Sequence, residues 1–310
     1  MKTSEYSRAW VFPGQGAHNI DLLREALSSK ELSSDIAFIS NLLKIPPSII
    51  STEINESTLA RNDVHSLIVT VLNRQSASIL KGKFGIPKSV AGYSVGMYSA
   101  LAVADVIKWD LIYDLVLNRS RFMIESNLLN PGEMIAVIGV DDALVEVELE
   151  AFRKKGGRAW VSNYNAPNQL TISVQAIDFD SVFSLLERMR PKRLIRIPVS
   201  GGWHSPLMEP ATEDFRQLLA GIEIEAPIIP VADNVSGGWL SSDPEAIRET
   251  LVKHLTYPVR WASNIRCVIS SGADPLIEVG SGDMLSKFGF FIDRNVRHLT
   301  VDRFLNTNNI

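Results

Sequence analysis

The sequence is nearly without cysteine, since Cys267 is the only one among its 310 residues. A single thiol can form neither an intramolecular disulfide nor a cysteine-rich metal cluster. Cys267 lies in the apolar stretch 265–269, where we expect a small buried side chain rather than a catalytic thiol. Any chemistry must therefore come from other residues.

Long apolar runs and an excess of basic charge are also missing. No stretch of about 18 uncharged apolar residues occurs, so no transmembrane helix is expected. Residues 1–9 include Lys2, Glu5 and Arg8 and no apolar run, which is unlike a secretory signal. The 31 basic and 35 acidic residues give a net charge of −4, so neither nucleic acid nor a membrane is an expected partner. We expect a cytoplasmic protein.

The sequence does contain short apolar segments that alternate with amphipathic ones, which is typical of an α/β protein. The expected strands are 9–12, 89–93, 134–140, 160–164, 170–174, 192–198, 228–232 and 275–279. The expected helices are 64–80, 99–106, 109–124, 142–154, 176–188 and 244–255.

The segment 134–198 has the order strand, helix, strand, strand, helix, strand, which is the order of a ferredoxin-like unit. Elements before and after it continue a larger α/β unit. The sequence therefore predicts a small subdomain, residues 131–198, inserted into a large subdomain made of 1–130 and 199–310.

A candidate nucleophile lies in Gly92-Tyr93-Ser94-Val95-Gly96, between an expected strand and an expected helix. A serine in this G-x-S-x-G pattern occupies a tight turn that projects its hydroxyl from the sheet edge, where a helix N-terminus can stabilise an oxyanion. A glycine-rich turn that contains a serine without a catalytic role would have the same sequence pattern. The strand–turn–helix context favours the nucleophile.

A serine hydroxyl needs a base, and the five histidines are the candidates. His204 follows an expected strand in a loop of small residues, a good position from which to reach a sheet-edge serine. His254 lies near a helix end, where histidine often interacts with the helix dipole. His65 begins an apolar helix, His18 follows a glycine-rich turn, and His298 has no supporting context. His204 ranks first by a small margin.

Two further residues have patterns that suit anion binding. Gln15 lies between two glycines at a strand end, where its amide and side chain can approach a ligand closely; a plain type II turn uses the same residues. Arg119 lies on or beside the apolar face of the helix 109–124, whereas Arg121 is displaced from that face. A semi-buried arginine needs an anion, either a structural carboxylate or that of a substrate.

Together these residues resemble the malonyl-CoA:acyl carrier protein transacylase family, which includes the trans-acting acyltransferases of polyketide synthases. Matching blocks follow one another in the family's order over nearly the whole chain. They are 12–16, 92–96, 119–123, 163–169, 200–208, 255–261 and 278–285. The resemblance implies an α/β-hydrolase-like core with a ferredoxin-like insert and a site in the cleft between them.

The resemblance also implies residue roles. Ser94 would carry the acyl group and His204 would be its base, oriented by the main-chain carbonyl of His254 in place of an aspartate. Gln15 and the backbone of Val95 would form the oxyanion hole. Arg119 would pair bidentately with the malonyl carboxylate.

The sequence departs from the family at positions near the expected substrate. Tyr93 stands where histidine is usual and is similar to the malonate decarboxylase branch, and Met97 stands where glutamate is usual. Trp203 is bulkier than the phenylalanine common beside the base in malonyl-specific polyketide acyltransferases. With Asn163, these residues are expected to line the substrate.

The expected function is ping-pong transfer of malonyl from coenzyme A to the phosphopantetheine thiol of an acyl carrier protein, for fatty-acid or polyketide synthesis. No metal or redox cofactor is expected, and the chain is expected to be a monomer. An acidic carrier could dock on a local basic patch that the net charge hides. The alternatives are a hydrolase of acyl-carrier thioesters, a transacylase subunit of malonate decarboxylase, a non-catalytic carrier-docking subunit and a simple esterase.

Overall fold

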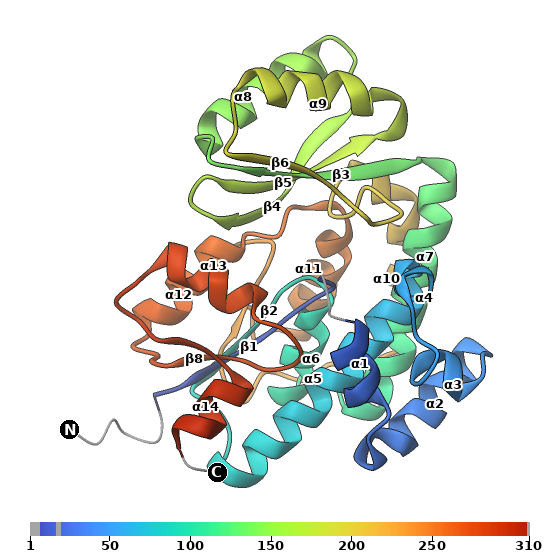
Figure 1. The fold of residues 1–310 in the computed structure, drawn as a ribbon, viewed down its shortest axis with the longest axis vertical. Helices are drawn as coiled ribbons and strands as arrows, with labels where there is room; N and C mark the ends of the chain where they lie inside the picture. Colours follow the sequence, from blue (N-terminus) through green and yellow to red (C-terminus); the bar gives the residue numbers. More distant parts are fainter. Residues whose placement is uncertain (1–6, 17–19, 309–310) are drawn as a thin grey trace.

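The computed structural model describes residues 7–16 and 20–308 of the chain and contains two β-sheets, one above the other in Figure 1. The large subdomain holds a five-stranded parallel sheet with the order β7-β2-β1-β8-β9. Its strands are β1 Ala9–Phe12, β2 Ser89–Gly92, β7 Val231–Ala232, β8 Leu276–Glu278 and β9 His298–Thr300. This parallel sheet confirms the predicted α/β class.

The central strand β1 is buried on both faces. Trp10 and Phe12 pack into one hydrophobic cluster, while Ala9 and Val11 pack into another on the opposite side of the sheet. Helices cover both faces of a parallel sheet. Because both faces are buried, its strands have continuous apolar sequences. The main helices of the large subdomain are α5 Asn62–Phe84, α6 Gly96–Val103, α7 Trp109–Leu129, α10 Thr212–Ala220, α11 Pro244–Thr256, α12 Trp261–Ser270 and α13 Met284–Ile292.

The small subdomain is a four-stranded antiparallel sheet with the order β4-β5-β3-β6. Its strands are β3 Gly132–Ile138, β4 Ala159–Ala166, β5 Gln169–Gln175 and β6 Arg193–Ile197. Both β3 and β4 pair antiparallel with β5, so β3, α8 (Asp142–Lys154) and β4 form a split β-α-β unit. Helices α8 and α9 (Phe179–Arg188) cover the outer face of this sheet, and its inner face lies toward the large subdomain (Figure 1).

Several boundaries differ from the sequence-based expectations. The strand expected at 228–232 is only Val231–Ala232, since it follows Pro230, which has no N–H to donate. The helix expected from Ser99 begins at Gly96, because the turn around Ser94 leads straight into it. Cys267, expected to be buried, is only half-buried on α12.

Some elements of the large subdomain were not predicted at all. Short helices fill 20–60: α1 Ile20–Leu27, α2 Ser33–Leu43, α3 Pro47–Ile50 and α4 Glu56–Ala60. The C-terminal β9 and α14 Val301–Thr307 were also missed, as were α10, α12 and α13. In the described part of the chain, no helix is long and apolar enough to cross a membrane.

Two glycines let β2, α6 and β1 meet at one point. A Cβ atom on Gly92 would lie 2.2 Å from the backbone of Gly96, and one on Gly96 would lie 2.2 Å from the carbonyl oxygen of Phe12. Only glycine permits such close backbone contact. The G-x-S-x-G spacing is therefore a packing requirement of this crossing.

We predict that Gly96→Ala lowers the free energy of unfolding by about 1–3 kcal/mol or more, because the added methyl group meets backbone atoms of β1 that cannot move independently. Chemical denaturation measures the change. Gly82→Ala in α5 is the matched control: a Cβ there meets nothing within 4 Å, and the better helix former should raise stability by up to about 1 kcal/mol. Equal stability of the two variants would contradict the packing explanation.

Candidate active site

Ser94 occupies the turn between β2 and α6, at the carboxyl end of the parallel sheet. Its backbone has φ 53°, a left-handed conformation that is uncommon outside glycine. The N–H of Gly96 donates to the carbonyl of Tyr93 at 2.9 Å, and that of Met97 donates to the carbonyl of Ser94 at 3.0 Å. This strained turn holds the hydroxyl at the sheet edge, as a nucleophile elbow does.

Asn234, just after the neighbouring strand β7, holds this turn in place, and the sequence analysis missed it. Its Oδ1 accepts from the N–H of Ser94 at 3.1 Å, and its Nδ2 donates to the carbonyl of Gly92 at 2.8 Å. Asn234 follows β7, which pairs with β2 in the sheet. A polar residue just after a short strand was the available signal, but strand order could not be read from the sequence.

His204 lies next to Ser94, as expected for its predicted base. The Ser94 Oγ lies 2.7 Å from His204 Nε2, and His204 Nδ1 lies 2.8 Å from the main-chain oxygen of His254. A carbonyl can only accept, so Nδ1 carries the proton and Nε2 is left to accept from the serine hydroxyl. His254 lies in the last turn of α11, where carbonyls lack intrahelical partners. The structure thus brings together the three residues predicted for catalysis.

Burial sets the protonation state of His204. Its side chain is 2% exposed, and this desolvation lowers its pKa to about 3; the nearby positive charge of Arg119 acts in the same direction. The hydrogen bond to the His254 carbonyl opposes the shift. Burial, followed by the charges of His204 and Arg119, also lowers the pKa of His254. His204 is therefore neutral at physiological pH and able to take a proton.

Arg119 is more deeply buried than the sequence suggested. It lies on α7 at 2% exposure, rather than semi-buried at the edge of the apolar face, while Arg121 is exposed. Its guanidinium lies 5.5 Å from the ring centroid of Tyr98. Its Nε and Nη2 atoms have no hydrogen-bond partner among the described residues, and burial lowers its pKa. Such a group is a ready site for an anion.

The predicted oxyanion hole involves the amides of Val95 and Gln15. In the described part of the chain, neither N–H donates to another residue, so both are free to bind an oxyanion. The Gln15 side chain turns away to α5, where its Nε2 donates to Asn62 Oδ1 at 2.8 Å and Ser66 Oγ at 3.2 Å. The backbone of Gln15 is thereby anchored, and its side chain is engaged elsewhere.

The four residues expected to line the substrate are all buried. The Tyr93 hydroxyl donates to Asn165 Oδ1 at 2.7 Å, and burial raises the pKa of Tyr93. Met97 lies in the hydrophobic core. The carbonyl of Trp203 accepts from Ser173 Oγ at 2.6 Å, and Asn163 Oδ1 accepts from Ser162 Oγ at 2.8 Å. Their contact with substrate remains a prediction.

The other histidines have different surroundings. His65 is buried in α5, and His298 Nε2 lies 2.9 Å from the carbonyl of Asp293. His18 lies outside the described residues. Next to His204, a pocket of about 410 Å³ opens between β4 and the segment after α11, lined by side chains that include Trp160, Tyr164, Tyr257 and Pro258.

Substitutions of Ser94 and His204 should distinguish the role of a nucleophile from that of a base. We predict that Ser94→Ala forms no covalent adduct with malonyl-CoA and that His204→Ala acylates more slowly by roughly three or more orders of magnitude. His254→Gln should keep most activity, because its carbonyl remains. Intact mass and single-turnover kinetics measure these effects. An adduct on Ser94→Ala would place the nucleophile elsewhere, and equal loss in both histidine variants would show that the His254 imidazole takes part.

The lowered pKa of His204 predicts a base that works in mild acid. Single-turnover acylation should change little between about pH 8 and about pH 5, because His204 protonates only near pH 3. The unfolded chain has the ordinary pKa of 6.5, so the stability linked to neutral His204 is complete above pH 6.5 and declines as the pH falls toward 3. An acylation rate that halves near pH 6.5 would show that the imidazole is not desolvated.

Comparisons with known proteins agree with the family resemblance found in the sequence. No family model matches the chain. The malonyl CoA-acyl carrier protein transacylase of Bacillus subtilis is 31% identical over 301 residues, which cover 94% of this chain and 92% of the relative. That of Staphylococcus aureus is 27% identical over 289 residues, covering 93% of each.

Solved structures of similar proteins match this fold over nearly the whole chain. The malonyl-CoA:acyl carrier protein transacylase of Xanthomonas oryzae has a TM-score of 0.88 at 27% identity and covers 99% of both chains. A malonyl-transacylase solved with a type II polyketide synthase acyl carrier protein has a TM-score of 0.87 at 26% identity, covering 98% of this chain and all of the other. With the Ser94–His204 geometry, these similarities show that the chain belongs to the malonyl-CoA:acyl carrier protein transacylase family.

Proposed function

We propose that this chain moves a malonyl group from coenzyme A to the phosphopantetheine thiol of an acyl carrier protein, through a malonyl ester of Ser94. The observation that carries the proposal is the buried guanidinium of Arg119, whose charge acts on His204. Relatives named for this transfer, one of them solved with its carrier protein, support the assignment.

Arg119 explains why the acyl group should carry a carboxylate. A buried guanidinium with two unpartnered donors among the described residues is costly unless an anion binds it. The free carboxylate of a malonyl thioester can accept one hydrogen bond from Nε and one from Nη2 of Arg119, with the two groups in one plane. Each of these charge-assisted hydrogen bonds is worth about 1.5–3 kcal/mol. An acetyl group has no atom to place there. The site should therefore select malonyl over neutral acyl groups.

The first half-reaction uses the neutral imidazole. His204 Nε2 accepts the proton of Ser94 Oγ as the oxygen attacks the thioester carbonyl, and the resulting oxyanion accepts from the amides of Val95 and Gln15. Collapse breaks the C–S bond, and the imidazolium returns the proton to the coenzyme A thiolate. Malonyl-Ser94 remains.

The second half-reaction reverses these steps with a new thiol. His204 deprotonates the phosphopantetheine thiol of the carrier, the thiolate attacks the malonyl ester, and Ser94 leaves with the proton. Arg119 holds the malonyl carboxylate throughout and fixes the ester carbonyl for attack. An oriented ester favours a positioned thiol over random water.

The proposed chemistry uses no metal or redox cofactor, because both half-reactions are acyl transfers between oxygen and sulfur. Phosphopantetheine arrives on the carrier protein. We also propose that the enzyme acts as a monomer, since Ser94, His204, Arg119 and the His254 carbonyl all come from one chain.

A thioester hydrolase acting on acyl carriers is the nearest alternative. It would use the same serine and histidine but would act on neutral acyl chains, which offer Arg119 no partner. The buried charge therefore favours transfer of a dicarboxylic acyl group over hydrolysis of a neutral one.

We predict that Arg119→Ala lowers the rate of malonyl loading by roughly two or more orders of magnitude, while acetyl loading stays level or rises. The readout is the malonyl-to-acetyl ratio of Ser94 acylation rates, followed by intact mass. Hydrolysis of the malonyl ester should also increase, because its orientation is lost.

Arg119→Lys is the matched control, since it keeps the charge but cannot bind a carboxylate bidentately. It should recover part of the malonyl preference. A wild-type enzyme that prefers neutral acyl chains, or a ratio that Arg119→Ala leaves unchanged, would remove the malonyl assignment and favour the hydrolase.

A further inference from the structure

The turn at Ser94 has one free backbone amide, because the neighbouring amides are all engaged. The N–H groups of 96–98 donate to the carbonyls of 93–95, each three residues back. The N–H of Ser94 donates to Asn234 Oδ1 at 3.1 Å. Within the described residues, the N–H of Val95 is therefore the one amide of 94–98 without a partner. By occupying the amide of Ser94, Asn234 leaves that of Val95 for an oxyanion.

Asn234 is itself held by a second amide side chain, that of Asn264. Nδ2 of Asn234 donates to the carbonyl of Gly92 at 2.8 Å and to Asn264 Oδ1 at 3.1 Å. Nδ2 of Asn264 donates in turn to the carbonyl of Asp233 at 2.7 Å. A carbonyl can only accept, so Asp233 requires the NH2 group of Asn264 on its side and leaves the oxygen facing Asn234. The direction of each hydrogen bond in this chain is thereby fixed.

Both amide side chains are removed from water. Asn234 is 1% exposed and Asn264 is fully buried. If one partner is lost here, water cannot replace it, and the remaining group stays unpaired at the full cost of its desolvation. An apolar side chain could fill the same volume without requiring matched partners. The pair therefore fixes a position as well as filling space.

The segment 254–264, which contains Asn264, also orients the base. The carbonyl of His254, at the end of α11, lies 2.8 Å from His204 Nδ1, and Asn264 lies on the next helix, α12. Between them, the N–H of Arg260 donates to the carbonyl of Asn234 at 2.9 Å. The segment 254–264 thus contacts both the base and the residue that supports the nucleophile.

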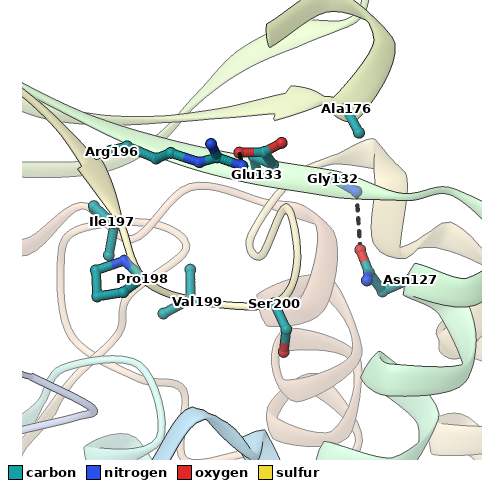
Figure 2. A pocket seen from close by; sticks show the side chains of 9 residues that line it. All are labelled: Asn127, Gly132, Glu133, Ala176, Arg196, Ile197, Pro198, Val199 and Ser200. Carbon is teal, nitrogen blue, oxygen red and sulfur yellow. Dashed lines mark hydrogen bonds and ion pairs between the residues drawn. The ribbon is translucent and has the colours of Figure 1, made fainter. Parts of the chain in front are cut away.

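The loop that leads to His204 has less support of its own. Val199 and Ser200 line a pocket of about 500 Å³ beside the end of β6, together with Asn127 and Ala176 (Figure 2). This part of the loop therefore borders open space, and Ser200 is exposed. The alignment of His204 with Ser94 depends on the segment 254–264 more than on 198–200.

We propose that Asn234 and Asn264 are positioning residues that align the free N–H of Val95 with the oxyanion formed at Ser94, a proposal that rests on the proposed function for its substrate. Asn234 contacts the turn directly, and Asn264 acts only through Asn234. Loss of either leaves the amide of Val95 unpaired but no longer fixed. Any group that the Ser94 hydroxyl attacks should be affected in the same way.

The test compares Asn234→Ala and Asn264→Leu with the wild type in the full-length chain, using two reagents. The first is malonyl-CoA, with acylation followed by intact mass and single-turnover kinetics. The second is a fluorophosphonate, which Ser94 Oγ attacks at phosphorus as fluoride leaves and His204 takes the proton. It reports on the nucleophile without placing a carboxylate at Arg119. Ser94→Ala should react with neither reagent.

We expect slower chemistry with little change in binding. Asn234→Ala should lower the maximal acylation rate roughly 100-fold and Asn264→Leu roughly 10-fold, while the malonyl-CoA concentration for half-maximal rate changes little, since the oxyanion forms only after binding. Because Asn264 acts through Asn234, the double variant should be no slower than Asn234→Ala alone. Asn264→Asp keeps the acceptor that faces Asn234 and should react within about three-fold of the wild type.

Val268→Ala is the matched control for lost stability. Val268 is fully buried on the same helix as Asn264. Its truncation should lower the midpoint of chemical denaturation, as Asn264→Leu does, while both reagents react within about two-fold of the wild-type rate.

Three results would overturn the role of the pair. They are wild-type rates for Asn264→Leu, equal slowing by Val268→Ala, and a double variant that is slower than Asn234→Ala by the factor that Asn264→Leu gives alone. A wild-type enzyme that reacts with the fluorophosphonate but forms no malonyl-Ser94 would instead contradict the proposed function and leave the positioning pair standing.

Discussion

The left-handed backbone of Ser94 is the constraint on which the rest of the site depends. It requires a glycine two residues away on each side, because β2, α6 and β1 approach within contact distance of their backbones there. It also requires Asn234, which follows the adjoining strand β7, accepts from the amide of Ser94 and donates to the carbonyl of Gly92. The energetic cost of the conformation is met by these contacts, and the result is a hydroxyl fixed 2.7 Å from His204 Nε2.

Burial of this pair gives the site its chemical character. The same loss of water lowers the pKa of His204, keeping the base neutral, and leaves the charge of Arg119 without a described partner for Nε and Nη2. A neutral imidazole and a guanidinium with unpartnered donors among the described residues are two consequences of the same burial. Under the proposed function, a bound carboxylate would pair with the guanidinium and leave His204 neutral.

The two subdomains are joined by hydrogen bonds that end on catalytic segments. Ser173 of β5 donates to the carbonyl of Trp203, directly before His204, and Tyr93, directly before Ser94, donates to Asn165 of β4. The amide of Tyr164 donates to the carbonyl of Val259 at 2.9 Å, five residues after His254. The small sheet therefore helps to hold the segments of Ser94, His204 and His254 in place, although these residues belong to the large subdomain.

The sequence by itself determined the α/β class and the β1, β2 and small-subdomain elements within a few residues, because glycine spacing and hydrophobic periodicity are local properties. It also singled out Ser94 from the G-x-S-x-G pattern, but it ranked His204 first by only a small margin, and the structure places the two side chains 2.7 Å apart. It did not reveal Asn234, Asn165 or Tyr98, since each acts across strands or helices far apart in the chain. It also underestimated the burial of Arg119, because periodicity on one helix cannot show what packs against it. The lowered pKa of His204 and the lack of a partner for Arg119 Nε and Nη2 among the described residues were decided only by the tertiary structure, which excludes water from both side chains.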